Sequence, residues 1–234
     1  RRQRDAALFI QTFLQPQMNR LSTAPINAEL IINVETDLVS IRPGVAVREP
    51  DPEALPNAVE RAARTAGRLG VLDYRAGADP DVTTAEIEAL GVTGLIGEFT
   101  TYHHCCEARV TNIHLIAAAT DGAIVMPGQT FSLNQHVGQR TREKGYVPAP
   151  AIIGGALECC DHPANIGGGT SQWPTTLYNA TFFAGLEDVF HQPHSEVISR
   201  YPEGREATLG WPAPDLVFRN NTGHAIVIRA TYTD

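Results

Sequence analysis

A glycine-rich loop that runs straight into a predicted helix is the part of this sequence best suited to chemistry. The loop spans residues 165–172, Asn-Ile-Gly-Gly-Gly-Thr-Ser-Gln, and the helix is predicted over 174–184 with Gly185 as its stop. Glycines can turn successive backbone N–H groups toward one point, and a helix N-terminus adds donors without a helical partner. A serine at such a place can act as a nucleophile beside a preformed oxyanion site. The candidate residues are therefore Ser171 as nucleophile and Gly168, Gly169, Thr170 and Gln172 as substrate-binding residues.

The alternative role for Ser171 is structural, because serine just before a helix is most often its N-cap. A catalytic serine would also need a base to take its proton. His194 is the best placed candidate, since it lies in the polar, loop-like segment 191–195, His-Gln-Pro-His-Ser.

Two arginines that follow this histidine, Arg200 and Arg205, can grip a substrate carboxylate through their forked donors. The alternative is that His194 and both arginines only satisfy loop carbonyls and Glu206. The segment 109–114 alternates polar and apolar residues, which fits a strand or a helix start, and we favour Asn112 as the cap of a following helix.

The four cysteines form two adjacent pairs, Cys105-Cys106 and Cys159-Cys160. A disulfide needs its Cα atoms well separated, so bonds between the pairs are easier to form than bonds within one. A metal site that adds His103, His104 or His162 and a set of free thiols are the alternatives. An even cysteine count favours an oxidising, extracytoplasmic compartment. We expect no metal and no cofactor.

The elements that must position these residues indicate an α+β fold in two parts. Residues 1–96 are predicted to form a small α+β module, and residues 97–234 a strand-rich α+β domain with one central helix. The module's predicted elements are a helix over 5–14 closed by Pro16, strands over 28–34 and 38–41, a helix over 52–66, and a helix that a Thr83–Glu86 capping box starts. The domain's predicted strands are 130–133, a hairpin over 151–158, and a hairpin that joins 216–218 to 225–231.

Charge and length exclude two classes of protein. The 234 residues include 18 Lys+Arg against 26 Asp+Glu, a net charge of −8, and no basic stripe, which excludes nucleic-acid binding. No apolar run is long enough to span a membrane. Because the sequence opens with Arg1 rather than Met, we expect any membrane attachment to come from an N-terminal anchor that precedes it.

Many short motifs, in order, resemble those of the VanW family over roughly residues 97–232. They are Pro127–Asn134 (PGQTFSLN), Gly167–Gly169, Thr175–Asn179 (TTLYN), Pro193–Ser195 and Gly204–Thr208 (GREAT). The region before them resembles, in position and texture, the peptidoglycan-binding domain that often precedes VanW domains. VanW proteins are bacterial, outward-facing, usually membrane-anchored, and named from vancomycin-resistance clusters.

This resemblance implies a cell-envelope protein whose partners are peptidoglycan stem peptides. Some VanW proteins are credited with cross-linking these peptides through a cysteine in a Gly-Gly-Gly-x-Cys-Gln motif, and Ser171 stands at that cysteine's position. The function expected is acyl transfer, as a transpeptidase or peptidase with a Ser171–His194 pair, and the alternative is a non-catalytic peptidoglycan-binding module. Placed on such a domain, the cysteines are expected to form two bonds between the pairs, with the partner assignment open.

Overall fold

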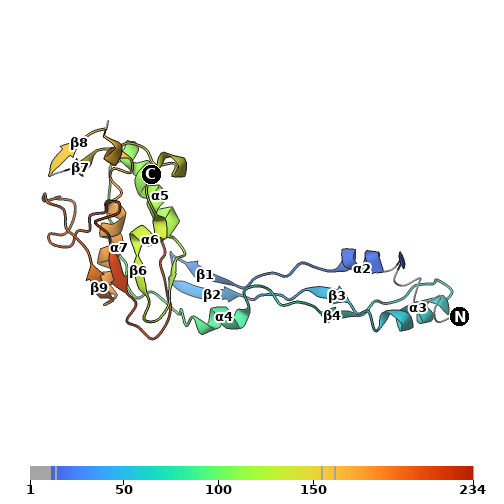
Figure 1. Ribbon diagram of the computed structural model, residues 1–234. Coiled ribbons are helices and arrows are strands. Elements are labelled where there is room, and N and C mark those ends of the chain that lie inside the picture. Colours follow the sequence, from blue (N-terminus) through green and yellow to red (C-terminus); the bar gives the residue numbers. More distant parts are fainter. Residues whose placement is uncertain (1–11, 14, 154, 161, 234) are drawn as a thin grey trace. The chain divides into compact units, whose positions relative to one another are not determined.

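The computed structural model describes residues 12–13, 15–153, 155–160 and 162–233. The chain divides into two compact units. The first takes in the residues up to Asn33 and Val39–Ala89, and the second takes in Val34–Leu38 and the residues from Leu90 onward. Both units mix helices with short strands, so the predicted α+β class is confirmed (Figure 1).

The first unit consists of two strand pairs and short helices. Strand β1 (Glu29–Asn33) pairs with β2 (Leu38–Arg42), and both strands alternate exposed and half-buried residues. Strand β3 (Arg48–Pro50) pairs antiparallel with β4 (Tyr74–Ala76). The helices are α2 (Gln15–Leu21), α3 (Leu55–Ala63) and α4 (Thr84–Ala89).

Local signals placed some of these helices well and others poorly. Thr83 and Glu86 form the predicted capping box: the Glu86 carboxylate accepts from the Thr83 N–H, and Thr83 Oγ1 accepts from the Glu86 N–H. The predicted helix over 5–14 falls almost entirely outside the described residues. Pro16, expected to close it, lies instead in the first turn of α2, where a missing N–H costs nothing.

The second unit is built around helix α5 (Ala108–Thr120) and helix α7 (Gln172–Phe183), which pack against each other. Its main sheet has the antiparallel order β6-β10-β9, and β5 pairs with β11. The remaining bounds are β5 Ile124–Val125, β6 Thr130–Ser132, α6 Leu133–Val137, β7 Ala151–Ile153, β8 Ala156–Glu158, β9 Glu187–Phe190, β10 Val217–Arg219 and β11 Ile226–Val227, with 3-10 turns at Arg142–Lys144 and Pro163–Asn165.

One hydrophobic core holds this unit together. Both long helices, α6 and the strands β5, β6 and β10 contribute buried side chains to it, among them Ile116, Val125, Leu133, Leu177 and Phe218. Removing these apolar surfaces from water is the main term that favours folding. The core therefore fixes the positions of the helices and strands that carry the loops before and after α7.

Helix α5 begins earlier than the sequence predicted, with Glu107 rather than Asn112 at its N-cap. Asn112, predicted as the cap of a following helix, lies inside α5 and is fully buried. Thr111 is exposed, but Asn112 does not face solvent as a polar residue does on an amphipathic surface helix. Its side chain binds two other loops of the domain, at Val147 and Gly168.

Two hairpin predictions had different outcomes. The β7–β8 hairpin is confirmed, with Ala151 opposite Glu158 and Ile153 opposite Ala156. The second predicted hairpin is wrong, because β10 pairs with β6 and β9 whereas β11 pairs with β5. The turn between them does form, since the buried Asn220 amide donates to the Val125 and His224 carbonyls. Long-range strand partners replaced the local one.

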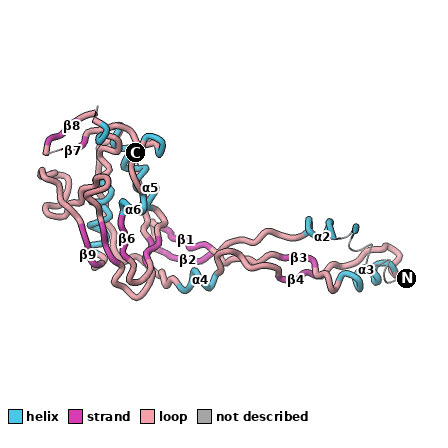
Figure 2. The backbone as a smooth tube through the Cα atoms, in the orientation of Figure 1, coloured by secondary structure: helices cyan, strands magenta, loops and turns pink. Residues whose placement is uncertain are grey.

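The chain between β9 and β10 contains no helix or strand, as the continuous loop colour in Figure 2 shows. It carries His194, Arg200, Arg205 and Glu206, so tertiary contacts alone position these side chains. Among the residues described, no helix is long and apolar enough to cross a membrane.

Candidate functional site

The glycine loop lies against residues 147–150 and helix α5, and side chains from both sides hold it there. Buried Asn112 donates from Nδ2 to the carbonyls of Val147 (2.8 Å) and Gly168 (2.9 Å), and its Oδ1 accepts from the Val147 N–H. A Cβ on Gly168 would collide with the Ala149 carbonyl oxygen. The loop is thus held by contacts that permit only glycine at this position.

Gly169 combines a left-handed backbone with a close neighbour. Its φ is +84°, and a Cβ there would lie 2.6 Å from Arg109 Cβ. Within the described part of the chain, the Thr170 and Gln172 N–H groups donate to the Gly167 and Gly169 carbonyls, while the N–H groups of Gly169 and Ser171 have no such acceptor. Two backbone donors on either side of Thr170 are therefore left without a backbone acceptor among the described residues.

Ser171 precedes α7 at the N-cap position but does not cap the helix with its side chain. Its half-buried Oγ accepts instead from the Leu209 N–H at 3.0 Å. The structural alternative of the sequence analysis, an N-cap hydroxyl, is therefore wrong. The hydroxyl is held by a distant segment of the chain.

That contact belongs to a polar stripe along α7. Thr175 Oγ1 accepts from the Ala207 N–H and donates to its carbonyl, and Asn179 Nδ2 donates to the Arg205 carbonyl. With Ser171, these residues lie four apart and so share one face of the helix. The stripe binds alternate residues of the extended segment 205–209, which therefore runs along α7 with Leu209 at Ser171 and Arg205 at Asn179.

His194 is paired with a carboxylate on the same segment. Its Nδ1 lies 2.6 Å from Glu206 Oε2, and both side chains are only 7% exposed. A proton on Nδ1 that is shared with Glu206 leaves Nε2 as the ring nitrogen able to accept a proton. Within the ranges that the structure describes, Ser171 and His194 share no direct hydrogen bond, so their pairing stays a prediction. The contact with Glu206 is the one that the sequence analysis gave for His194 as its structural alternative, and it orients the imidazole.

Arg109 is a site residue that the sequence analysis missed. Its Nη2 donates to Gln172 Oε1 at 2.6 Å, and Gln172 Nε2 donates to Thr101 Oγ1. Thr101 in turn contacts Thr176 Oγ1 at 2.7 Å. The predicted substrate-binding residue Gln172 is thus buried and committed to this network. Only the packing of α5 on α7 reveals it, because Arg109 and Gln172 lie far apart in the sequence.

The two predicted substrate arginines lie in different places. Arg200 lies over the ring of buried Tyr201, with its Cζ 4.6 Å from the ring centroid. The Arg205 guanidinium lies over Phe182 and Phe183 at the other end of α7, a 12-residue helix. At ~1.5 Å per residue, about 18 Å of helix separates that end from the glycine loop. Substrate binding by Arg205 stays a prediction, and the position of Arg205 at the far end of α7 does not support it.

The cysteines are arranged differently from the expected pattern. A disulfide joins Cys159 to Cys160 across a cis peptide bond, with Cα atoms 3.1 Å apart, and Cys106 Sγ donates to Cys105 Sγ at 2.7 Å. The two predicted bonds between the pairs are wrong. Cys105 and Cys106 lie in an exposed bend before α5, whereas Cys159 follows β8, so each sulfur meets its sequence neighbour instead.

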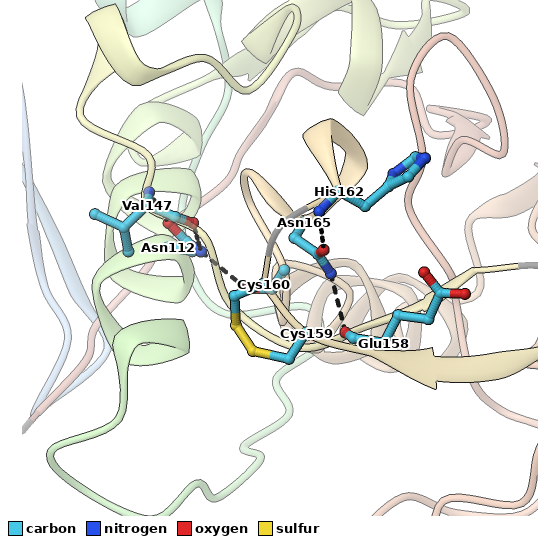
Figure 3. The surroundings of a disulfide bond; sticks show 8 residues. Asn112, Val147, Glu158, Cys159, Cys160, His162 and Asn165 are labelled. Carbon is cyan, nitrogen blue, oxygen red and sulfur yellow. Dashed lines mark hydrogen bonds between the residues drawn. A yellow bond between two sulfur atoms is a disulfide. The ribbon is translucent and has the colours of Figure 1, made fainter.

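This disulfide is linked to the glycine loop through Asn165 (Figure 3). The buried Asn165 amide donates to the Glu158 carbonyl at 2.9 Å, and its Oδ1 accepts from the His162 N–H. The Asn165 carbonyl accepts from the N–H groups of Ala149 and Gly168. The predicted metal alternative finds no support, since no group of three or more His, Cys, Asp or Glu side chains gathers as a metal site within the described ranges.

Comparison with known protein families identifies the part of the chain that contains this site. The family model described as VanW like protein matches residues 108–234, which include the glycine loop, Arg109, Ser171, His194 and Glu206. The chain belongs to the VanW family. This membership confirms the resemblance seen in the sequence and indicates a cell-wall-related protein.

The VanW match extends to a curated relative. The chain is 42% identical over 139 residues to the "Uncharacterized protein YoaR" of Bacillus subtilis (strain 168). The aligned stretch covers 59% of this chain and 44% of the relative, so the chain spans less than half of that protein's length. No solved structure matches the chain significantly.

Proposed function

We propose that this VanW domain is an acyl-transfer enzyme of the bacterial cell envelope that acts on peptidoglycan stem peptides. The observation that supports it best is the extended segment 205–209. At one end it holds Glu206 on His194 at 2.6 Å, and at the other its Leu209 N–H fixes Ser171 Oγ. A base oriented by a carboxylate and an anchored hydroxyl thus depend on the same five-residue segment, as in a nucleophile–base–acid set.

The proposed reaction uses the donor and acceptor sites of Ser171, His194 and the glycine loop that make no other hydrogen bond among the described residues. Ser171 Oγ would attack the peptide carbonyl while its proton passes to His194 Nε2, and the N–H groups of Gly169 and Ser171 would stabilise the oxyanion. The C–N bond then breaks and the leaving amine takes the proton from His194. The resulting serine ester would pass its acyl group to an amine, giving transpeptidation, or to water, giving hydrolysis.

We place this reaction outside the cytoplasm. A disulfide at Cys159–Cys160 supports an oxidising compartment, since thiols in the cytosol are kept reduced. The first unit is proposed to bind peptidoglycan, and membrane attachment is proposed to come from an anchor that precedes Arg1.

A covalent adduct on Ser171 tests the enzyme. After incubation with disaccharide-peptide fragments, the proteolytic peptide of the protein that contains Ser171 should gain the mass of the fragment's acyl group, as measured by mass spectrometry. Ser171→Ala should abolish the adduct, and Ser40→Ala, at an exposed serine of β2, should leave it unchanged. An adduct that persists in Ser171→Ala would contradict the proposal.

One observation favours a second function, a non-catalytic binding module. Because Ser171 belongs to the polar stripe that holds segment 205–209, its hydroxyl has a structural use without any chemistry. In that case the fragments would bind to the wild type and to Ser171→Ala alike, and neither would form an adduct.

A further inference from the structure

Two guanidinium groups from different parts of the chain meet at Tyr201. Arg200 stacks on this ring. Arg109 and Arg200 both interact electrostatically with the Tyr201 phenol and with each other. Tyr201 is 7% exposed, and burial raises its pKa, so the phenol stays neutral and offers no charge to balance the arginines.

Arg109 has donor capacity that the fold does not use. Its side chain is 18% exposed, and its buried Nε has no hydrogen-bond partner in the described part of the chain. The carboxylate of Glu107 lies 3.9 Å from that Nε, beyond hydrogen-bond reach. An unsatisfied charged donor is costly unless a ligand completes it.

No carboxylate of the fold neutralises the second arginine. The ion pairs found between described residues do not include Arg200, and nearby Glu206 is committed to His194. Burial and the positive charge of Arg200 lower the pKa of Arg109, yet a guanidinium stays protonated at neutral pH. Two cations held together in this way favour an anion between them.

The arginine pair adjoins the proposed nucleophile. Arg109 contacts Gly169 through Cβ and binds the Gln172 side chain, and these two residues flank the Thr170-Ser171 dipeptide. Arg109 therefore lies beside the loop that carries Ser171.

We propose that Arg109, Arg200 and Tyr201 form a carboxylate-binding site that recognises the C-terminal carboxylate of a stem peptide. Forked guanidinium donors match the two oxygens of a carboxylate, and the Tyr201 hydroxyl adds a neutral donor. The site makes the enzyme selective for a bond next to the C-terminal end of a peptide, and the residue that carries the carboxylate departs as the amine. This inference rests on the proposed function of Ser171, and it specifies which end of the stem peptide the enzyme recognises.

Binding of two matched peptides tests the site without chemistry. A synthetic stem tetrapeptide with a free C-terminal carboxylate, and the same peptide as its C-terminal amide, are titrated by calorimetry into the full chain carrying Ser171→Ala. The acid should bind at least about tenfold more tightly, since the amide loses the charge-assisted hydrogen bonds to the guanidinium groups. Equal affinities for the acid and the amide would overturn the inference.

Variants assign the effect to the arginine pair. Arg109→Gln and Arg200→Gln should each remove most of the preference for the acid while leaving affinity for the amide, which also shows that the variants are folded. Arg109→Lys keeps the charge but loses the fork, so it should retain part of the preference. Arg219→Gln, at an exposed arginine of β10, is the matched control and should change neither affinity.

Two further results separate this site from its alternatives. Inorganic phosphate should displace the acid peptide only weakly, and displacement at concentrations no higher than that of the peptide would overturn the carboxylate assignment. With wild-type protein, a Ser171 adduct that forms equally from acid and amide would refute this inference and leave the proposed function standing. Acid-selective binding without any adduct would support this site and refute the proposed function.

Discussion

In the proposed mechanism, Ser171 and His194 each use one hydrogen bond to hold the fold and keep a second donor or acceptor for proton transfer. The serine oxygen accepts from the Leu209 N–H, which leaves the hydroxyl proton for a base. The His194 ring is fixed through Nδ1 by Glu206, which leaves Nε2 to receive a proton. Serine is a weaker nucleophile than the cysteine that the family resemblance places here, so the orientation of this base matters more in this chain.

Glu206→Gln is the sharpest test at this scale. The amide can still fill the space beside His194, but it removes the charge that stabilises the imidazolium formed during proton transfer. We expect Ser171 adduct formation to slow at least about a hundredfold, within the range typical of lost general-base catalysis. The rate is measured by quenched-flow mass spectrometry, and Glu203→Gln, at an exposed glutamate nearby, should leave it unchanged. An unchanged rate in Glu206→Gln would mean that His194 is not the base.

At the scale of elements, α5 holds the glycine loop, and α7, which continues from the loop, holds the segment that orients the proposed base. Helix α5 supplies Asn112 to the loop and Arg109 to Gln172, and α7 supplies the stripe that binds segment 205–209. The loop itself forms no regular structure, so its conformation depends on these side chains and on the close approach of Gly168 to Ala149. A change in either helix should therefore reach the site.

Asn112→Ala tests this dependence. It removes the partner of the Val147 N–H and of the buried Gly168 carbonyl, and it leaves the Val147 carbonyl with the Gly167 N–H alone, which should lower the free energy of unfolding by about 3 kcal/mol. Denaturant unfolding followed by fluorescence measures the change. Asn221→Ala, at an exposed asparagine with one 3.3 Å hydrogen bond, should cost less than about 0.5 kcal/mol. Similar losses in both variants would show that Asn112 is not a special anchor.

At the scale of the whole molecule, the second unit carries all the residues of the proposed chemistry and its own hydrophobic core. The family match begins at residue 108, inside this unit. The first unit, in contrast, holds neither histidine nor cysteine up to Ala89. This division is consistent with the proposal that the second unit carries out the reaction and the first unit binds peptidoglycan or acts as a spacer.

Deleting the first unit should separate these two roles. A chain of residues 90–234, which keeps the second unit except for Val34–Leu38, should remain folded, as judged by a cooperative thermal transition, and should form the Ser171 adduct at a rate similar to that of the full chain. It should also sediment less with purified peptidoglycan sacculi, because the proposed binding module is gone. Undiminished sedimentation of the folded shorter chain would refute peptidoglycan binding by the first unit.

The sequence by itself determined the features that depend on near neighbours. The Thr83–Glu86 capping box, the β7–β8 hairpin and the helix after the glycine loop all formed, because their hydrogen bonds link residues a few positions apart. The ordered motifs also determined the family. The pairing of β10, the role of Asn112 and the position of Arg109 could not be predicted in this way.

Only the tertiary structure decided which distant groups share a site. Leu209 on Ser171, Glu206 on His194 and Arg109 on Gln172 each join residues on different segments, and one residue of each pair lies where no local pattern marks it. The sulfurs show the reverse case, since the expected long-range bonds gave way to a bond between sequence neighbours. The physical reason is common to both: a hydrogen bond or disulfide needs contact within a few ångströms, and packing of the whole core decides which groups come that close.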